Sequence, residues 1–348
     1  MTIEEPEKVN VENLLNNAIF QKRKTMLDDT KTHFFNQQSE NIQWEKYVTF
    51  DGNVKRVTFR LLGLKKTTPF NIKRAKNTLE KLSEKLKIKV NYSAREKVSR
   101  DDFLGRDLVV VLGGDGTLTS IAHSVDEETP VMGVNSHPRE MDNNGSYGFY
   151  MGSDPVNFAE DIKKALNNQA IINVLPRLQA EISTTSGNII RSDPALNDLL
   201  LANTHQYQPS KYRLQRKEDG KNSEINCAQY SSGCLFSTFL GQGAWYRHIN
   251  NIEGTTFPEN EIDNHYLFVS RDLPRNDRRD DGTYWAWTNQ PTIFTSDMHR
   301  GYVVADGWDE THFTRGATIE VSLNGPTLKL LTFRNTIYDR VSYWIKPN

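Results

Sequence analysis

Between residues 51 and 170, short apolar runs alternate with segments whose apolar side chains recur at helical spacing. The predicted strands cover residues 54–62, 88–92, 107–112 and 130–134, and the predicted helices cover residues 71–87 and a segment from about Thr117. Strands that alternate with helices are typical of βαβ units and a parallel sheet. The run LVVVL is apolar at every position, which predicts a central strand with both faces covered. We therefore expect an α/β domain over residues 51–170.

From about residue 171 the pattern changes to short β-rich stretches separated by turn signals. These stretches cover residues 172–184, 211–219, 234–240, 265–271, 291–296, 301–307 and 318–334. Short strands with frequent turns indicate an antiparallel, sandwich-like second domain, which we expect over residues 171–335. Residues 1–50 are polar with some helical patterning and are predicted to form a helical arm. For residues 336–348, a return to the first domain stays open.

The composition argues against several classes of protein. The formal net charge of the 348 residues is −1, which gives no electrostatic reason to expect nucleic acid or an anionic membrane as the main partner. The only two cysteines, Cys227 and Cys234, suit a reducing compartment rather than a disulfide framework. No apolar run approaches the ~20 residues that a membrane-spanning helix needs, and the first residues lack the features of a signal or transit peptide. We expect a soluble, cytoplasmic protein.

The third predicted strand ends abruptly in the sequence Gly-Gly-Asp-Gly-Thr, residues 113–117. Ligands of open α/β sheets bind outside the carboxyl ends of the strands. The glycines Gly113, Gly114 and Gly116 let backbone N–H groups approach a phosphate without interference from a Cβ atom. Thr117 is expected to cap the following helix, whose N-terminus favours anions. The turn therefore predicts a phosphate-binding site.

Asp115 is the unusual residue of this turn, because a carboxylate repels phosphate. Its presence is explained if it binds Mg²⁺ indirectly or accepts a proton from an attacking hydroxyl group. The alternative is a tight turn in which Asp115 only caps the helix. The motif is neither GxGxxG nor GxxxxGKS/T, so it indicates neither a dinucleotide-fold oxidoreductase nor a P-loop enzyme.

The GGDGT sequence resembles a motif shared by NAD kinases, by diacylglycerol and sphingoid lipid kinases and, more distantly, by phosphofructokinases. The segment that follows, PVMGVNSHPREMDNNGSYGFY at residues 130–150, is similar to the NAD kinase pattern of Gly-x-Asn and then Gly-x-Gly-Phe. Lipid kinases carry Gly-Thr-Gly-Asn at the comparable place, and this chain has none. The resemblance implies that Asn135 and Phe149 contact the dinucleotide. Taken singly, they read equally well as a turn residue and a core aromatic residue.

A second signature lies at residues 194–203, PALNDLLLAN. It resembles the Ala-Leu-Asn-Glu/Asp segment at a strand start in NAD kinases. The resemblance implies that Asn197 and Asp198 hold the nucleotide substrate, with the acid gripping the ribose hydroxyl groups. A carboxylate and an amide at a strand start suit the recognition of a vicinal diol, although an Asn-Asp pair alone is usually just a turn.

A third signature, YSSGCLFSTFLGQGAWYRH at residues 230–248, resembles the glycine-rich stretch of the organellar-type branch of NAD kinases. The resemblance implies dinucleotide contacts for four of its residues, Ser232, Thr238, Ala244 and Trp245. Most members of the family read Thr-Gly-Thr-Gly-Ser or Thr-Pro-Thr-Gly-Ser, whereas this chain has Phe-Leu-Gly-Gln at residues 239–242 after the threonine. The effect of this altered loop on the substrate contacts stays open. Asp306, in a later Asp-Gly pair, is a candidate site residue or part of a hairpin turn.

The NAD kinase resemblance runs from about residue 54 to the end of the chain and implies a Rossmann-like α/β domain followed by a β-sandwich. It implies that ATP donates its γ-phosphoryl group to the adenosine ribose 2′-hydroxyl group of NAD, giving NADP, with Asp115 as the catalytic base. The resemblance also implies that Gly113, Gly114, Gly116 and Thr117 bind the phosphates of ATP. Mg²⁺ is expected to arrive with ATP rather than at a metal site of the protein. A homodimer or homotetramer built through the β-rich domain is expected as well.

Two alternatives belong to other classes. A diacylglycerol or sphingoid-type lipid kinase would share the GGDGT turn. A dinucleotide-binding regulator without catalysis would explain the altered loop at residues 239–242, but the retained Asp115 argues against it. Within the main hypothesis, the choice between NAD and NADH, and between ATP and polyphosphate, stays open.

Overall fold

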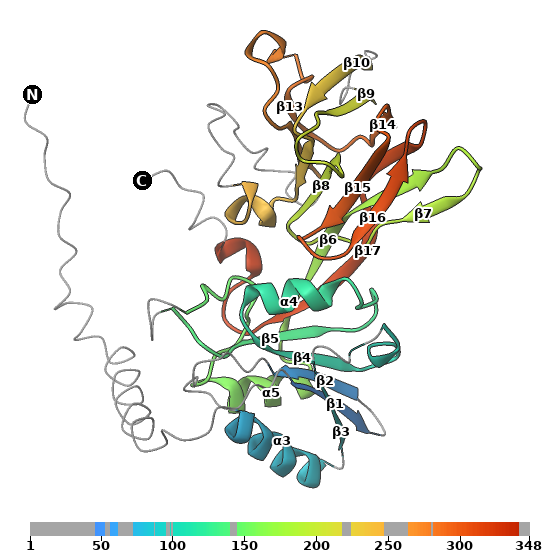
Figure 1. Ribbon diagram of the computed structural model, residues 1–348. Helices are drawn as coiled ribbons and strands as arrows, with labels where there is room; N and C mark the ends of the chain where they lie inside the picture. The colour runs from blue at the N-terminus through green and yellow to red at the C-terminus, as the bar shows by residue number, and fades with distance from the viewer. Residues whose placement is uncertain are drawn as a thin grey trace, which may run out of the picture.

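The molecule has an α/β part and a β-rich part, which Figure 1 shows joined by two long strands. The computed structural model describes residues 46–52, 56–61, 72–86, 88–94, 98, 100–139, 145–217, 224–246, 264–279 and 281–340. Of the helical arm predicted over residues 1–50, only residues 46–50 lie within these ranges, and they belong to strand β1 (Lys46–Gly52). The remainder of the predicted arm lies outside the described residues.

The α/β part is built on a mixed sheet whose centre is parallel. Strands β2 (Arg56–Leu61), β4 (Leu108–Gly113) and β5 (Val131–Asn135) pair in parallel, as the alternating pattern predicts. At the edge, β3 (Ile88–Ala94) pairs antiparallel with β1, which pairs antiparallel with β2. This edge differs from the expected parallel arrangement because the segment between β1 and β2 is too short for the crossover that a parallel pair requires.

Helices cover both faces of this sheet. They are α3 (Ile72–Leu86), α4 (Asp115–Ala122) and α5 (Phe158–Leu166). Leu108, Val110 and Leu112 of β4 pack with α3 and α5, whereas Val109 and Val111 pack with α4. Successive residues of a strand point to opposite faces, so LVVVL is buried on both sides, which confirms the prediction. None of the described helices is long and apolar enough to cross a membrane.

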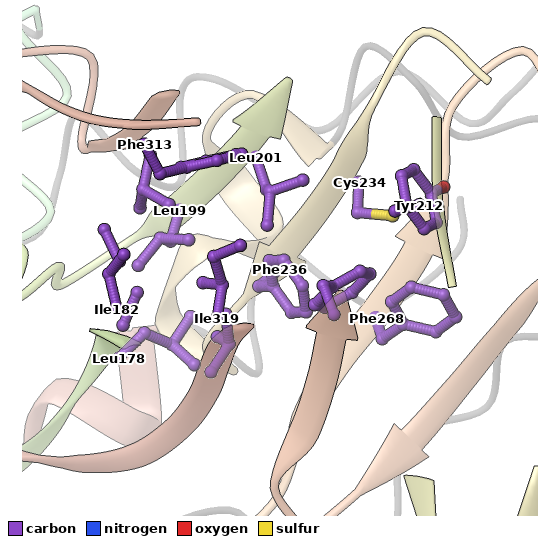
Figure 2. Packing of buried hydrophobic residues seen from close by; sticks show 14 of the residues in the cluster. Leu178, Ile182, Leu199, Leu201, Tyr212, Cys234, Phe236, Phe268, Phe313 and Ile319 are labelled. Atoms are coloured by element: carbon purple, nitrogen blue, oxygen red, sulfur yellow. The ribbon is translucent and has the colours of Figure 1, made fainter. Parts of the chain in front are cut away.

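The β-rich part is a sandwich of two layers. Among the described residues, one layer is an antiparallel sheet of β13 (Trp285–Thr288), β12 (Tyr266–Ser270), β11 (Cys234–Ser237), β8 (Asp198–Asn203), β15 (Arg300–Ala305) and β16 (Glu310–Thr314), in spatial order. The other layer contains β10 (Glu224–Ser231), β9 (Ser210–Lys217), β14 (Thr292–Ser296), β17 (Thr318–Thr332), β6 (Ile171–Ser183) and β7 (Ile189–Arg191). Figure 2 shows Phe236 and Leu199 of the first layer packed beside Ile319 and Leu178 of the second. The predicted sandwich-like second domain is confirmed.

Two long strands, β6 and β17, run through both parts. The last residues of β17 pair in parallel with β5, Leu330 lying opposite Val131, and its first residues pair antiparallel with β14. β6 pairs with β17 along most of its length, with register shifts around Gly325. One continuous sheet therefore extends from the α/β part into the sandwich (Figure 1). The domain boundaries expected near residues 170 and 335 stay predictions.

A buried arginine holds the junction between the two parts. Arg177 of β6 donates hydrogen bonds to four backbone carbonyl groups, those of Ala122 (2.5 Å), Val125 (3.1 Å), Thr327 (3.1 Å) and Pro326. Burial lowers the pKa of its guanidinium group to about 10, so the group keeps its charge at neutral pH. Ala122 is the last residue of α4, where a cation also complements the helix dipole. Arg177 thereby fixes α4 against β6 and β17.

Candidate active site

The glycine-rich turn lies where β4 ends and α4 begins, at the carboxyl edge of the parallel strands. α4 begins at Asp115, and Gly114 rather than Thr117 occupies its N-cap position. The expected capping role of Thr117 is wrong, because Thr117 already lies inside the helix and donates its N–H group to the carbonyl of Gly114 at 2.9 Å. A Cβ atom on Gly114 would lie 2.8 Å from the Cβ atom of Ser146, so glycine permits this close approach. Phosphate contacts of Gly113, Gly114, Gly116 and Thr117 stay a prediction.

Asp115 is held by two donors from the loop after β5. The Ser146 hydroxyl group donates to its Oδ2 atom at 2.9 Å, and the Tyr150 N–H group donates to its Oδ1 atom at 2.9 Å. The N–H group of Asp115 donates in turn to Ser146 Oγ at 3.2 Å. Each carboxylate oxygen can accept more than one hydrogen bond. The half-buried side chain is therefore fixed in orientation and still able to accept a proton.

Asn135, at the end of β5, shapes this loop. Its Oδ1 atom accepts the N–H group of His137 at 3.2 Å, and its Nδ2 atom donates to the carbonyl of Ser146 at 3.1 Å. Gly148 has φ of +66°, and a Cβ atom there would lie 2.3 Å from Asn135 Nδ2. Asn135 thus helps to place Ser146 beside Asp115, and its predicted contact with the dinucleotide stays a prediction.

Phe149 and Tyr150 follow, with their rings packed edge to face and the ring centroids 5.0 Å apart. Phe149 is half-buried, and its predicted dinucleotide contact stays a prediction. Tyr150 is only 2% exposed, and its hydroxyl group donates to Oδ1 of Asn197 at 2.5 Å. The loop after β5 therefore meets the second signature directly. The roles of Ser146 and Tyr150 are not predicted from the sequence, where the one signal is that both lie within two residues of the Gly-Phe pair of the motif.

The second signature is held in place by Asp306, in the turn after β15. Its carboxylate accepts three successive backbone N–H groups, from Leu196 (2.8 Å), Asn197 (2.7 Å) and Asp198 (3.1 Å). The N–H group of Asp306 donates to the carbonyl of Asp198 at 2.9 Å. Its φ of +50° places it in the left-handed region, which non-glycine residues seldom adopt. The sequence leaves open whether Asp306 is a site residue or part of a hairpin turn. In the structure Asp306 lies in a turn and also holds the backbone of the second signature.

Asp198 is a buried acid, only 6% exposed, at the first position of β8. Burial raises the pKa of its carboxyl group to about 7, and the charge of Asp306 adds to this shift. A hydrogen bond from the backbone of Trp245 opposes it. Asp198 therefore changes charge close to neutral pH. Hydrogen-bond donors of a bound ligand would stabilise its ionised form.

His123, directly after α4, supplies a positive charge next to Asp306. Its Nε2 atom lies 3.5 Å from the Asp306 carboxylate and its Nδ1 atom lies 3.8 Å from that of Asp193. Burial lowers the pKa of the imidazole, but the two carboxylates outweigh burial and raise the pKa from 6.5 to about 9. His123 is therefore an imidazolium cation at neutral pH. The sequence gives no signal for this role.

Thr238 of the third signature faces the protein rather than an open site. Its hydroxyl group donates to the carbonyl of Leu196 at 2.6 Å, and its N–H group donates to the carbonyl of Asn197 at 2.9 Å. Thr238 thus holds the backbone of the second signature in place through these hydrogen bonds. Its predicted dinucleotide contact stays a prediction.

The altered loop after Thr238 forms the 3-10 turn η3 (Leu240–Gly243). Phe239 and Leu240 are buried in the same core cluster as Leu118 of α4. A Cβ atom on Gly241 would lie 2.0 Å from the carbonyl oxygen of Asn197, so glycine is required there. Two of the three departures from the family pattern are therefore core residues.

Ala244, Trp245 and Ser232 take different positions. Ala244 and Trp245 are half-buried beside Asp198, which accepts a hydrogen bond from the Trp245 backbone. The Arg271 guanidinium group lies 5.0 Å from the centroid of the Trp245 ring. Ser232 is exposed before β11, whose other end, at Ser237, pairs with Asp198. The structure therefore does not bring Ser232 to this cluster.

No group of three His, Cys, Asp or Glu side chains that could hold a metal ion occurs in the part of the chain that the structure describes. Asp115 is the acid that lies at the start of α4. Its carboxylate has the oxygen chemistry that Mg²⁺ prefers. Mg²⁺ carried by ATP stays a prediction.

A glycine-rich turn with an acid after a parallel strand, facing an Asn-Asp pair on a β-sandwich, defines the class of kinases with a GGDGT motif. A family model of the ATP-NAD kinase N-terminal domain matches residues 21–170. A probable NADH kinase of Oryza sativa subsp. japonica is 25% identical over 244 residues, which cover 66% of this chain and 72% of that protein. An NAD kinase of Halorhodospira halophila is 31% identical over 155 residues, which cover 43% of this chain and 46% of that protein.

Two solved structures share the fold. Yeast NADH kinase complexed with NADH gives a TM-score of 0.55 at 16% identity, covering 71% of this chain and 68% of that chain. An NAD kinase from Archaeoglobus fulgidus in complex with ATP gives a TM-score of 0.51 at 16% identity, covering 78% of this chain and 94% of that chain. Residues 21–170 therefore match the N-terminal domain of ATP-NAD kinases, and the relatives that extend this match are named NAD or NADH kinases. The assignment of the chain to the organellar-type branch stays a prediction.

Proposed function

We propose that this chain is an ATP-dependent NAD kinase, which transfers the γ-phosphoryl group of ATP to the adenosine ribose 2′-hydroxyl group of NAD or NADH. The match of residues 21–170 to the ATP-NAD kinase N-terminal domain and the similarity to a probable NADH kinase support this proposal. The observation that carries it is the placement of Asp115. Its carboxylate is oriented by Ser146 and Tyr150, and Tyr150 also holds Asn197 of the proposed acceptor site.

In this mechanism the ribose is held by Asn197 and Asp198 with its 2′-oxygen beside Asp115. The bond between the 2′-oxygen and the γ-phosphorus forms, the bond from the γ-phosphorus to the bridging oxygen of ADP breaks, and the 2′-hydroxyl proton passes to the Asp115 carboxylate. A positioned base of this kind contributes ~10²–10⁴-fold to the rate. Backbone N–H groups at the start of α4 stabilise the phosphate charge. Mg²⁺, when bound with ATP, neutralises part of that charge.

Both oxidation states of the acceptor fall within the proposal. The rice relative is named a probable NADH kinase, and the yeast structure contains NADH. The bacterial relatives are named NAD kinases. The proposal therefore covers NAD and NADH as substrates, and a direct comparison of the two decides which is preferred.

The test is an end-point assay of the purified chain with ATP, Mg²⁺ and either NAD or NADH. In the NAD arm, a strictly NADP-dependent dehydrogenase reduces the product NADP and so measures it. In the NADH arm, residual NADH is oxidised first, and the same dehydrogenase then measures the product NADPH in the reverse direction. Formation of NADP or NADPH that requires ATP supports the proposal. Absence of both products at high enzyme concentration would contradict it, and polyphosphate in place of ATP tests the donor in the same format.

The two rival functions are outcomes of this test. A lipid kinase is not favoured, because the family model and the relatives are NAD kinases. A regulator without catalysis was suggested by the altered loop, but Phe239 and Leu240 in that loop are core residues. Binding of NAD without turnover would support the regulator.

We also propose that the protein is cytoplasmic and forms a homodimer or homotetramer. The outer face of the sheet that contains β13 supports an oligomer, because Trp285, Trp287 and Tyr302 are only partly buried there. Light scattering on the purified chain gives the oligomeric state, and a monomer would contradict this proposal. A fluorescent fusion tests the location.

A further inference from the structure

We propose that Tyr150 is a positioning residue that fixes the side chain of Asn197 relative to Asp115, an inference that rests on the proposed function. Tyr150 belongs to the loop after β5, and Asn197 directly precedes β8 of the sandwich. The N–H group of Tyr150 donates to Asp115 Oδ1 at 2.9 Å, and its hydroxyl group donates to Asn197 Oδ1 at 2.5 Å. One residue thus contacts the proposed base and the proposed acceptor site.

The backbone of Asn197 is held within the sandwich. Asp306 accepts its N–H group at 2.7 Å, and its carbonyl accepts the N–H group of Thr238 at 2.9 Å. Both contacts leave the amide side chain able to rotate. The contact that orients the amide comes from Tyr150, on the other part of the molecule. Removal of the Tyr150 hydroxyl group would therefore free the amide without releasing the backbone.

The hydrogen bond also sets which end of the amide faces the ligand. Burial, with the charges of Asp306, Asp115 and Asp198, raises the pKa of the Tyr150 hydroxyl group, which therefore remains a donor. The oxygen of the Asn197 amide faces this donor, so the Nδ2 group is turned away from Tyr150. We infer that Nδ2 donates to an oxygen of the acceptor nucleoside. A phenylalanine at position 150 would let the amide turn its oxygen toward the ligand instead.

The ring of Tyr150 has a separate packing role. It lies in the core cluster that contains Leu196 and Phe239, and it meets the Phe149 ring edge to face. Tyr150→Phe keeps this ring and removes only the hydroxyl group. Tyr266 offers a matched control, because it is also buried and its hydroxyl group donates to the carbonyl of Gln290 at 2.7 Å within the sandwich.

The experiment is a double-mutant cycle with Tyr150→Phe, Asn197→Ala and the double variant, and with Tyr266→Phe as the control. We expect Tyr150→Phe alone to lower kcat/KM for NAD(H) and to raise its Kd by roughly 3- to 10-fold, the effect of one hydrogen bond. KM for ATP should stay unchanged. In the Asn197→Ala background the same change should have no further effect on kcat/KM or Kd. Tyr266→Phe should lower the melting temperature while leaving both constants unchanged.

Two results would overturn the inference. One is an equal loss from Tyr150→Phe with and without the Asn197 amide, because the hydroxyl group would then act independently of Asn197. The other is no loss in either background. Titration calorimetry measures the Kd for NAD of the wild type and of each variant in the cycle, and it does so even if the wild-type chain shows no turnover. A wild-type chain that binds NAD without phosphorylating it would therefore overturn the proposed function separately, and a chain that does neither would overturn both.

Discussion

The imidazole Nε2 atom of His123 lies 3.5 Å from the Oδ2 atom of Asp306, across the junction between α4 and the sandwich. Asp306 Oδ2 also accepts the N–H group of Leu196 at 2.8 Å. His123 directly follows α4, the helix that begins with Asp115. This ion pair therefore ties the helix that carries the proposed base to the turn that presents Asn197.

Replacement of His123 by Gln should reduce the free energy of unfolding in a pH-dependent way. The folded-state pKa of about 9 is higher than the ordinary value of 6.5. The stabilisation is therefore fully present below pH 6.5 and is lost as the pH rises through 9, with an upper limit of about 3 kcal/mol. Urea unfolding of wild type and variant at pH 6 and pH 9.5 measures it. An equal difference at both pH values would contradict the charged pair.

Affinity for NAD(H) should increase as the pH rises through about 7. The pKa of the Asp198 carboxyl group is raised to about 7 by burial and by Asp306, so the unliganded group is largely protonated below that pH. Hydroxyl groups of a ribose donate better to the ionised carboxylate, and binding is therefore coupled to loss of a proton. Calorimetric titrations with NAD between pH 6 and pH 8 test this. Asp198→Asn should bind weakly with a flat profile, and an unchanged slope in that variant would exclude Asp198 as the origin.

Gly241→Ala should impair the acceptor site, with Gly243→Ala as a control in the same turn. A Cβ atom at Gly241 would lie 2.0 Å from the carbonyl oxygen of Asn197, whereas one at Gly243 meets no atom within 4 Å. Displacement of Asn197 should lower kcat/KM for NAD(H) by about 10- to 100-fold. Steady-state kinetics of both variants are the measurement. Equal kinetics for the two would show that η3 does not support Asn197.

The elements that could be predicted are those whose pattern is local. The buried LVVVL run and the following GGDGT turn lie next to one another in the chain, and the structure places them as a central strand and a helix start. The place of β1 between β2 and β3 could not be foreseen, because it depends on the pairing of β1 with β3, a segment distant from it in sequence. The capping role expected for Thr117 is wrong because α4 begins earlier, at Asp115, so Thr117 lies within its first turn.

Within the site, the sequence motifs identified the residues that present functional groups and missed the residues that hold them. Asp306 and Asn197 are 109 positions apart, and no local pattern reveals that one carboxylate accepts three backbone N–H groups of the other segment. Tyr150 is similar, because only the docking of the loop onto the sandwich brings its hydroxyl group to Asn197. Thr238 is the opposite case. The motif predicts that it presents a functional group to the ligand, whereas its hydroxyl group donates to a backbone carbonyl and holds the site together.

The most direct test of the central claim is a comparison of Asp115→Asn with wild type in two measurements, kcat for NAD(H) phosphorylation and Kd for NAD. Asparagine keeps the shape of the side chain and an oxygen for Ser146 or Tyr150, but it cannot take the 2′-hydroxyl proton. We predict that kcat falls by ~10²–10⁴-fold while Kd for NAD stays within a few-fold. An Asp115→Asn enzyme with the kcat of wild type would contradict the assignment of Asp115 as the base.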